Sequence, residues 1–284
     1  MVTNLIFILK AIIIGIVEGI TEFLPVSSTG HMIIVGHLIG FNEGGGPAAI
    51  YSKAYLNMFE VVIQLGAILA IVVLYWNKIK GSFENFSPSK PKSGFKFWFN
   101  IFVACIPAGI LGILFKDKIE AKLFYPLPVS IALLVGAFWM LYAEKKYRRK
   151  FTTRTIDDIT VKQAIIVGIF QCLALWPGMS RSASTIIGGW ICGLSTVAAA
   201  EFSFFLALPV MVGASALSIL KHTVALNIPQ VIALTVGFVV SFIVALIVVD
   251  KFITFLKKKP MRVFAIYRVL IGIIMLGLIF TQVI

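Results

Sequence analysis

Residues 177–185 read Pro-Gly-Met-Ser-Arg-Ser-Ala-Ser-Thr, and they lie in the middle of the apolar run 161–194. Proline and glycine stop a helix where they stand, so this run splits into two short helices joined by a polar turn. An arginine is costly in hydrocarbon and by default marks a functional site. The stretch therefore predicts a re-entrant hairpin, which a membrane tolerates only where the turn faces protein or a watery cavity.

A second interruption of the same kind divides residues 5–40. Here Glu18-Gly-Ile-Thr-Glu22 is followed by Pro25-Val-Ser-Ser-Thr-Gly-His31. We expect each helix of both hairpins to be shorter than a full membrane span. No cleavable signal peptide is predicted, because the apolar residues 5–23 lead into the polar stretch without a small-residue cleavage pattern.

The composition indicates that this chain lies in a membrane. It is 60% hydrophobic and 13% charged, whereas soluble domains carry about 25% charged residues. Crossing a bilayer takes roughly 20 apolar residues. The fold class predicted is an all-α integral membrane protein with two re-entrant hairpins and about six transmembrane helices. The six expected spans are 55–76, 98–115, 126–143, 197–220, 230–250 and 263–283.

The formal net charge of +13 does not indicate a nucleic-acid partner. Most basic residues fall in three short loops, 78–96, 145–162 and 251–262, which is the pattern that orients membrane proteins with these loops in the cytoplasm. The same loops would contact anionic membrane lipids. With the six spans alternating sides, the first hairpin enters from the outer side and the second from the inner side. Homo-oligomerisation is left open, because lipid-facing and partner-facing apolar surfaces look alike in one sequence.

The two hairpins resemble each other. Gly15-Ile-Val-Glu18 parallels Gly168-Ile-Phe-Gln171, and each hairpin is followed by a span with an acidic residue. Two similar units of opposite orientation form an inverted repeat, whose broken helices meet near the middle of the membrane. We predict a single membrane domain, 1–284, with repeat one at about 1–143, a cytoplasmic linker at 144–160 and repeat two at about 160–284. Both polar turns should then face one pocket.

The second turn has the donors that a phosphate requires. Arg181 can hold two phosphate oxygens with its planar guanidinium, and the backbone amides after Gly178 add donors if the turn opens a helix. Hydroxyl groups nearby add further hydrogen bonds. The substrate-binding candidates in this turn are Gly178, Ser180, Arg181, Ser182 and Thr185. In the first turn they are Ser27 and Thr29, for which a purely structural capping role is an equally good interpretation.

The first turn supplies the groups that the second lacks. Glu18 and Glu22 are four residues apart, so they share a helix face and can bind Mg²⁺ or Ca²⁺ together. A hydroxyl, an imidazole and a carboxylate can also meet here, which is a grouping that activates a nucleophile. The catalytic candidates are Glu18, Glu22, Ser28, His31 and Arg181. We favour Ser28 as the nucleophile, assisted by His31 and Glu22, but attack by His31 or by a metal-bound water stays open.

Other polar residues in the spans are expected to be structural. Glu60, Gln64 and Glu201 are predicted to pair across the bundle, and Arg268 is assigned a structural role near a span end. The three cysteines, Cys105, Cys172 and Cys192, lie in apolar stretches without metal-ligand spacing and are interpreted as small buried hydrophobic residues.

The two polar stretches together resemble the signature motifs of the bacterial undecaprenyl-diphosphatase family (BacA or UppP type). The resemblance extends over essentially the whole chain and includes Phe59-Glu-Val-Val-Ile-Gln-Leu-Gly66 and Ala200-Glu-Phe-Ser-Phe204. It implies hydrolysis of a polyprenyl diphosphate lipid to the monophosphate, dependence on a divalent metal, and bacitracin resistance. It also implies the bacterial inner membrane, with an active site open to the periplasmic side.

A competing hypothesis is a carrier that moves a polyprenyl phosphate across the membrane without hydrolysing it. Inverted repeats with broken helices are also the way in which many transporters build a substrate site. A carrier would need the arginine and the hydroxyls but no nucleophile. The combination of Glu22, Ser28 and His31 therefore favours the phosphatase.

Overall fold

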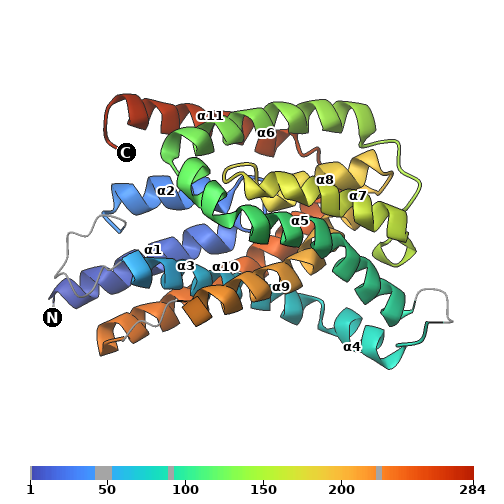
Figure 1. The fold of residues 1–284 in the computed structure, drawn as a ribbon, viewed down its shortest axis with the longest axis horizontal. Coiled ribbons are helices and arrows are strands. Elements are labelled where there is room, and N and C mark those ends of the chain that lie inside the picture. The colour runs from blue at the N-terminus through green and yellow to red at the C-terminus, as the bar shows by residue number, and fades with distance from the viewer. Residues whose placement is uncertain (1, 42–52, 89–92, 222–225) are drawn as a thin grey trace.

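The computed structural model describes residues 2–41, 53–88, 93–221 and 226–284 (Figure 1). Part of the first basic loop, residues 89–92, lies outside these ranges. Within them the chain is helical, and an isolated bridge between Thr153 and Leu194 accounts for its β pairing.

Six of the described helices are long and apolar enough to cross a membrane, which confirms the predicted fold class. Each one overlaps an expected span, with ends that differ by at most eight residues. They are α3 (Lys53–Leu74), α5 (Gly94–Leu123), α6 (Pro126–Tyr147), α9 (Thr196–Lys221), α10 (Ile228–Lys258) and α11 (Arg262–Phe280). The short elements α4 (Trp76–Glu84) and η1 (Ile156–Asp158) belong to the connections that follow α3 and α6.

The remaining helices form the two interrupted segments. The first contains α1 (Val2–Thr21) and α2 (Ser28–Leu38), and the second contains α7 (Val161–Gln171), η2 (Cys172–Leu175) and α8 (Arg181–Ile191). Figure 1 places α1 and α2 in the half of the molecule that holds both chain termini, and α7 and α8 in the opposite half. The division into two inverted repeats stays a prediction.

The expected length was wrong for one of these helices. With 11 residues each, α2, α7 and α8 are about 16 Å long, half of a membrane span. In contrast, α1 has 20 residues and reaches about 30 Å. No proline interrupts it, and its one basic residue is satisfied because Lys10 Nζ donates to the Gly40 carbonyl at 3.0 Å.

The turns between the paired helices end in the same way. Ser27 caps α2 with φ 70°, and its hydroxyl accepts from the Gly30 amide. Ser180 caps α8 with φ 69°, and its hydroxyl accepts from the Ala183 amide. A positive φ is uncommon for a residue with a side chain and is found where the surroundings enforce it. The first residue of each helix, Ser28 or Arg181, is thereby presented at the tip of its hairpin.

Close helix packing fixes the direction from which the tips arrive. α1 packs along α10, and α7 packs along α5. A Cβ atom on Gly15 would lie 2.7 Å from the Gly237 carbonyl oxygen of α10, so only glycine permits this approach. Gly168 of α7 meets the Ala104 backbone of α5 in the same manner. These contacts hold the helices that carry Glu18 and Gln171 against the bundle.

Candidate active site

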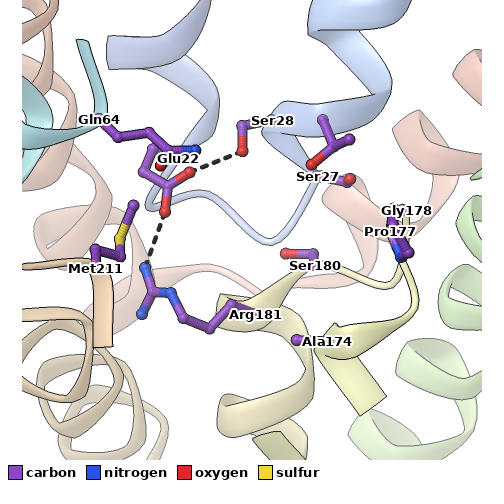
Figure 2. Close-up of a pocket in the computed structure, with 11 residues that line it drawn as sticks. Glu22, Ser27, Ser28, Gln64, Ala174, Pro177, Gly178, Ser180, Arg181 and Met211 are labelled. Carbon is purple, nitrogen blue, oxygen red and sulfur yellow. Dashed lines mark hydrogen bonds and ion pairs between the residues drawn. The ribbon is translucent and has the colours of Figure 1, made fainter. Parts of the chain in front are cut away.

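The two hairpin tips enclose a cavity of about 190 Å³. Figure 2 shows the tip of the first hairpin facing the tip of the second across this space. Five of the predicted substrate-binding residues lie on the cavity wall, and so do three predicted catalytic residues, with Arg181 belonging to both groups. The lining residues are Glu22, Ser27, Ser28, Thr29, Gln64, Ala174, Pro177, Gly178, Ser180, Arg181 and Met211.

Glu22 joins the two tips. Its Oε2 accepts a hydrogen bond from the Ser28 hydroxyl at 2.7 Å. Its Oε1 accepts from Nη2 of Arg181 at 3.2 Å, in an ion pair between two largely buried side chains. Residues 159 positions apart therefore meet at one carboxylate (Figure 2). The Ser28 hydroxyl is thus hydrogen-bonded to the Glu22 carboxylate, which is also paired with the Arg181 guanidinium.

The guanidinium of Arg181 is held in place and keeps donors free for a ligand. Nη1 donates to the Ser203 carbonyl of α9 at 2.7 Å. The group also lies 5.9 Å from the centre of the Phe23 ring. Because an arginine has five N–H donors, the contacts with Ser203 and Glu22 leave further N–H groups that can reach into the cavity.

Some predicted substrate-binding hydroxyls instead support the second tip. Ser182 is fully buried and donates to the Leu24 carbonyl of the first hairpin at 2.8 Å. Thr185, also fully buried, donates to the Arg181 carbonyl, and its oxygen can accept from the Ser203 hydroxyl at 2.7 Å. Neither side chain lies on the cavity wall. Their rotation on α8 turns them toward backbone carbonyls and away from the cavity, so they brace Arg181 without facing the cavity.

His31 also lies away from the cavity wall. Its Nδ1 is 2.8 Å from the Ser27 carbonyl, and its Nε2 is 2.8 Å from the Tyr267 hydroxyl of α11. The two rings stack, with centroids 5.5 Å apart. Both ring nitrogens are therefore engaged, and the expected contact between His31 and Ser28 is absent from the described hydrogen bonds. Both His31 and Glu22 were expected beside Ser28, but among the described hydrogen bonds only the Glu22 carboxylate contacts its hydroxyl.

Glu18 lies one helical turn before Glu22 and is only 1% exposed. Its Oε1 has no hydrogen-bond partner among the described residues. Glu22, Glu60 and Arg181 are all within its electrostatic reach. A buried carboxylate oxygen without a donor is costly, and the carboxylate pair at this site is chemically suited to Mg²⁺ or Ca²⁺. The described residues do not gather three or more His, Cys, Asp or Glu side chains into one metal-binding group.

Four of the lining residues were not among the predicted site residues. Gln64 of α3 was expected to pair across the bundle, as Glu201 does with Tyr75 at 3.3 Å, but it lies on the cavity wall. Ala174, Pro177 and Met211 complete the wall. The four-residue spacing of Glu60 and Gln64 could have indicated that Gln64 belongs to the site, since it places both polar residues on one face of α3.

Comparison with known proteins gives a family for this chain. The sequence matches the family described as bacitracin resistance protein BacA over residues 11–274. A protein of Clostridium novyi named undecaprenyl-diphosphatase is 70% identical over 96% of both chains. Undecaprenyl-diphosphatase 2 of Clostridium acetobutylicum is 59% identical over the full length of both chains, and undecaprenyl-diphosphatase of Clostridium tetani is 56% identical over 96% of both. The chain therefore belongs to the bacitracin resistance protein BacA family.

Proposed function

We propose that the protein hydrolyses undecaprenyl diphosphate to undecaprenyl phosphate and inorganic phosphate within the membrane. The reaction recycles the lipid carrier of cell-wall synthesis and gives bacitracin resistance. The observation that carries this proposal is the 2.7 Å hydrogen bond from Ser28 to Glu22 in the same cavity as Arg181. The names of the relatives support the substrate, because undecaprenyl-diphosphatase is the activity assigned to each.

The cavity is suited to binding the diphosphate. The N-terminal ends of α2 and α8 both begin at it, with Ser28 and Arg181 as their first residues. Helix N-termini present free amides and a partial positive charge to anions. Arg181 adds a full positive charge, and the Ser180 hydroxyl on the cavity wall adds another polar contact. The isoprenoid chain would leave the site between helices toward the bilayer.

The chemistry follows from the order of the contacts. The Ser28 oxygen attacks the terminal phosphorus while its proton passes to Glu22, which is the acceptor of its hydrogen bond. The bond from that phosphorus to the bridging oxygen breaks, and undecaprenyl phosphate departs with the bridging oxygen. Glu22 releases that proton to the departing phosphate, and its carboxylate then takes a proton from the water that attacks the phosphoserine. The bond from phosphorus to the Ser28 oxygen breaks, Glu22 returns the proton to Ser28, and inorganic phosphate is released. Arg181 stabilises the charge on the transferring phosphoryl group throughout.

A carrier without hydrolytic activity is the alternative. It would use Arg181 and the helix N-termini in the same way. The contact between Ser28 and Glu22 speaks against it, since anion binding alone gains nothing from placing a carboxylate against the hydroxyl. Hydrolysis uses that pair directly.

We also propose a divalent metal cofactor, held by Glu18 and Glu22. The unpaired Oε1 of Glu18 is the observation that favours it. When bound, Mg²⁺ or Ca²⁺ would neutralise charge on the substrate oxygens and offset the repulsion between the two carboxylates.

For the location we propose the bacterial cytoplasmic membrane, with the cavity open to the outer side. The described parts of the basic loops lie in the half of Figure 1 that is away from both termini. Their positions there are given by α4, by η1 and by the connection between α10 and α11. Positively charged loops face the cytoplasm. The first hairpin, which comes from the opposite half, would then enter from the outside.

Phosphate release tests the activity and the metal together. Purified protein in detergent is expected to release inorganic phosphate from undecaprenyl diphosphate, and EDTA is expected to lower the rate by at least about tenfold. Adding back Mg²⁺ or Ca²⁺ should restore it. A protein that releases no phosphate with either metal, yet moves labelled lipid across vesicles, would establish the carrier instead. Full activity in EDTA would contradict the proposed metal cofactor but not the proposed hydrolysis.

Arg181→Lys should lower the turnover number by about 100-fold, a loss of the size found when one transition-state donor is removed. Lysine keeps the charge but has three donors on one atom, so it cannot hold Glu22, the Ser203 carbonyl and two phosphate oxygens together. The rate of phosphate release per folded molecule is the measurement. Arg149→Lys, at the exposed end beyond α6, is the matched control. Equal rates for the two variants would exclude Arg181 from the site.

A further inference from the structure

Arg268 is a buried arginine that lies outside the cavity wall. It is 0% exposed, although it belongs to the membrane-spanning helix α11. A charged side chain in this position needs partners for every donor, because none is available from lipid. Its surroundings therefore indicate what it is for.

Backbone carbonyls surround the guanidinium. Nε donates to Leu133 at 3.3 Å, and Nη2 donates to Ala132 at 3.2 Å, both on α6. The other contacts are with the hairpin tips. Nη1 donates to Pro25 of the first tip at 3.4 Å and to Met179 of the second tip at 2.9 Å, and Nη2 donates to Gly178 of the second tip at 3.0 Å. One planar group thus joins both tips to α6.

We infer that Arg268 is a positioning residue that keeps the two tips in register, so that Ser28 and Arg181 face each other across the cavity. This inference rests on the proposed function. The first tip carries the nucleophile, and the second carries the groups that hold the phosphate. A shift of about 1 Å between reacting groups can cost 100-fold in rate. A clamp of five hydrogen bonds from a rigid group prevents that shift.

A glycine opposite the guanidinium supports the inference independently. A Cβ atom on Gly136 of α6 would lie 2.9 Å from Cζ of Arg268 and closer still to Nη2. The guanidinium cannot move aside without breaking its contacts with the tips. Gly136→Ala therefore disturbs the clamp while Arg268 itself is unchanged. Gly277→Ala on α11 is a matched control, because a Cβ atom there meets nothing within 4 Å.

Arg268→Lys and Gly136→Ala are the two test variants. Lysine has three donors and cannot satisfy five carbonyls. In folded, monodisperse protein, both variants are expected to lower kcat for undecaprenyl diphosphate by about 100-fold. KM should change by less than about threefold, since Arg181 and Ser180, the main side-chain donors to the diphosphate, stay together on the second tip. The controls Gly277→Ala and Arg262→Lys should retain the wild-type kcat.

Hydrogen–deuterium exchange gives a readout that does not depend on activity. Amides of residues 24–28 and 177–181 are expected to exchange at least about tenfold faster in both test variants, with α3 and α10 unchanged. Wild-type kcat in the folded variants, or faster exchange throughout the bundle, would overturn the inference. So would failure of both variants to fold, since Arg268 would then be a requirement of folding alone. An inactive wild-type protein would instead count against the proposed function. The exchange data would still show whether Arg268 holds the two tips in position.

Discussion

Glu22→Gln is expected to lower the turnover number by about 1,000-fold, within the range for loss of a positioned general base. The amide has nearly the same shape as the carboxylate, but it cannot accept the Ser28 proton. One of its two ends would also present N–H groups, either to the Ser28 hydroxyl or to the Arg181 guanidinium. The substitution therefore removes the base and weakens the link between the tips in one step.

The measurement is phosphate release per folded molecule, with thermal unfolding recorded alongside. Glu84→Gln is the matched control, because Glu84 is exposed on α4 and pairs only loosely with Lys80 at 3.7 Å. Loss of folded protein with an unchanged rate in the remainder would assign Glu22 a structural role. A rate that falls only in the Glu22 variant supports the base.

Ser28→Ala is expected to reduce turnover by at least about 1,000-fold, because removing a nucleophile removes the covalent route altogether. The substitution is small, and Ser27 still caps α2, so folding should be preserved. Substrate with a radiolabelled terminal phosphate should leave a label on the wild-type protein after a rapid acid quench. The Ser28→Ala protein should carry none.

This experiment also separates the nucleophiles that the sequence left open. His31→Ala should keep the label on the enzyme, since both ring nitrogens of His31 are engaged by Ser27 and Tyr267. A label that survives Ser28→Ala but not His31→Ala would move the attack to the imidazole. Single-step hydrolysis by water predicts no label even in the wild type, with Ser87→Ala serving as the unaffected control.

The sequence by itself determined the class of the protein, the six spans and the two broken segments. These follow from local properties of the chain: apolar runs have a favourable transfer free energy into lipid, and proline and glycine next to several polar residues favour the end of a helix. The residue types of the site were also evident, because a polar island in hydrocarbon is too costly to be accidental. Ser28, Glu22 and Arg181 could therefore be predicted as neighbours.

Only the tertiary structure decided which polar groups face the cavity and which support it. Ser182 and Thr185 belong to the same motif as Arg181, yet they turn toward carbonyls supplied by Leu24 and Arg181. Similarly, Arg268 satisfies carbonyls from three separate segments of the chain, which no local pattern brings together. The direction of a side chain depends on helix rotation and on the backbone carbonyls that packing places beside it. The partners of Ser182 and Arg268 are distant in sequence, so their positions are set when the bundle closes, whereas the bond from Thr185 to Arg181 is local to α8.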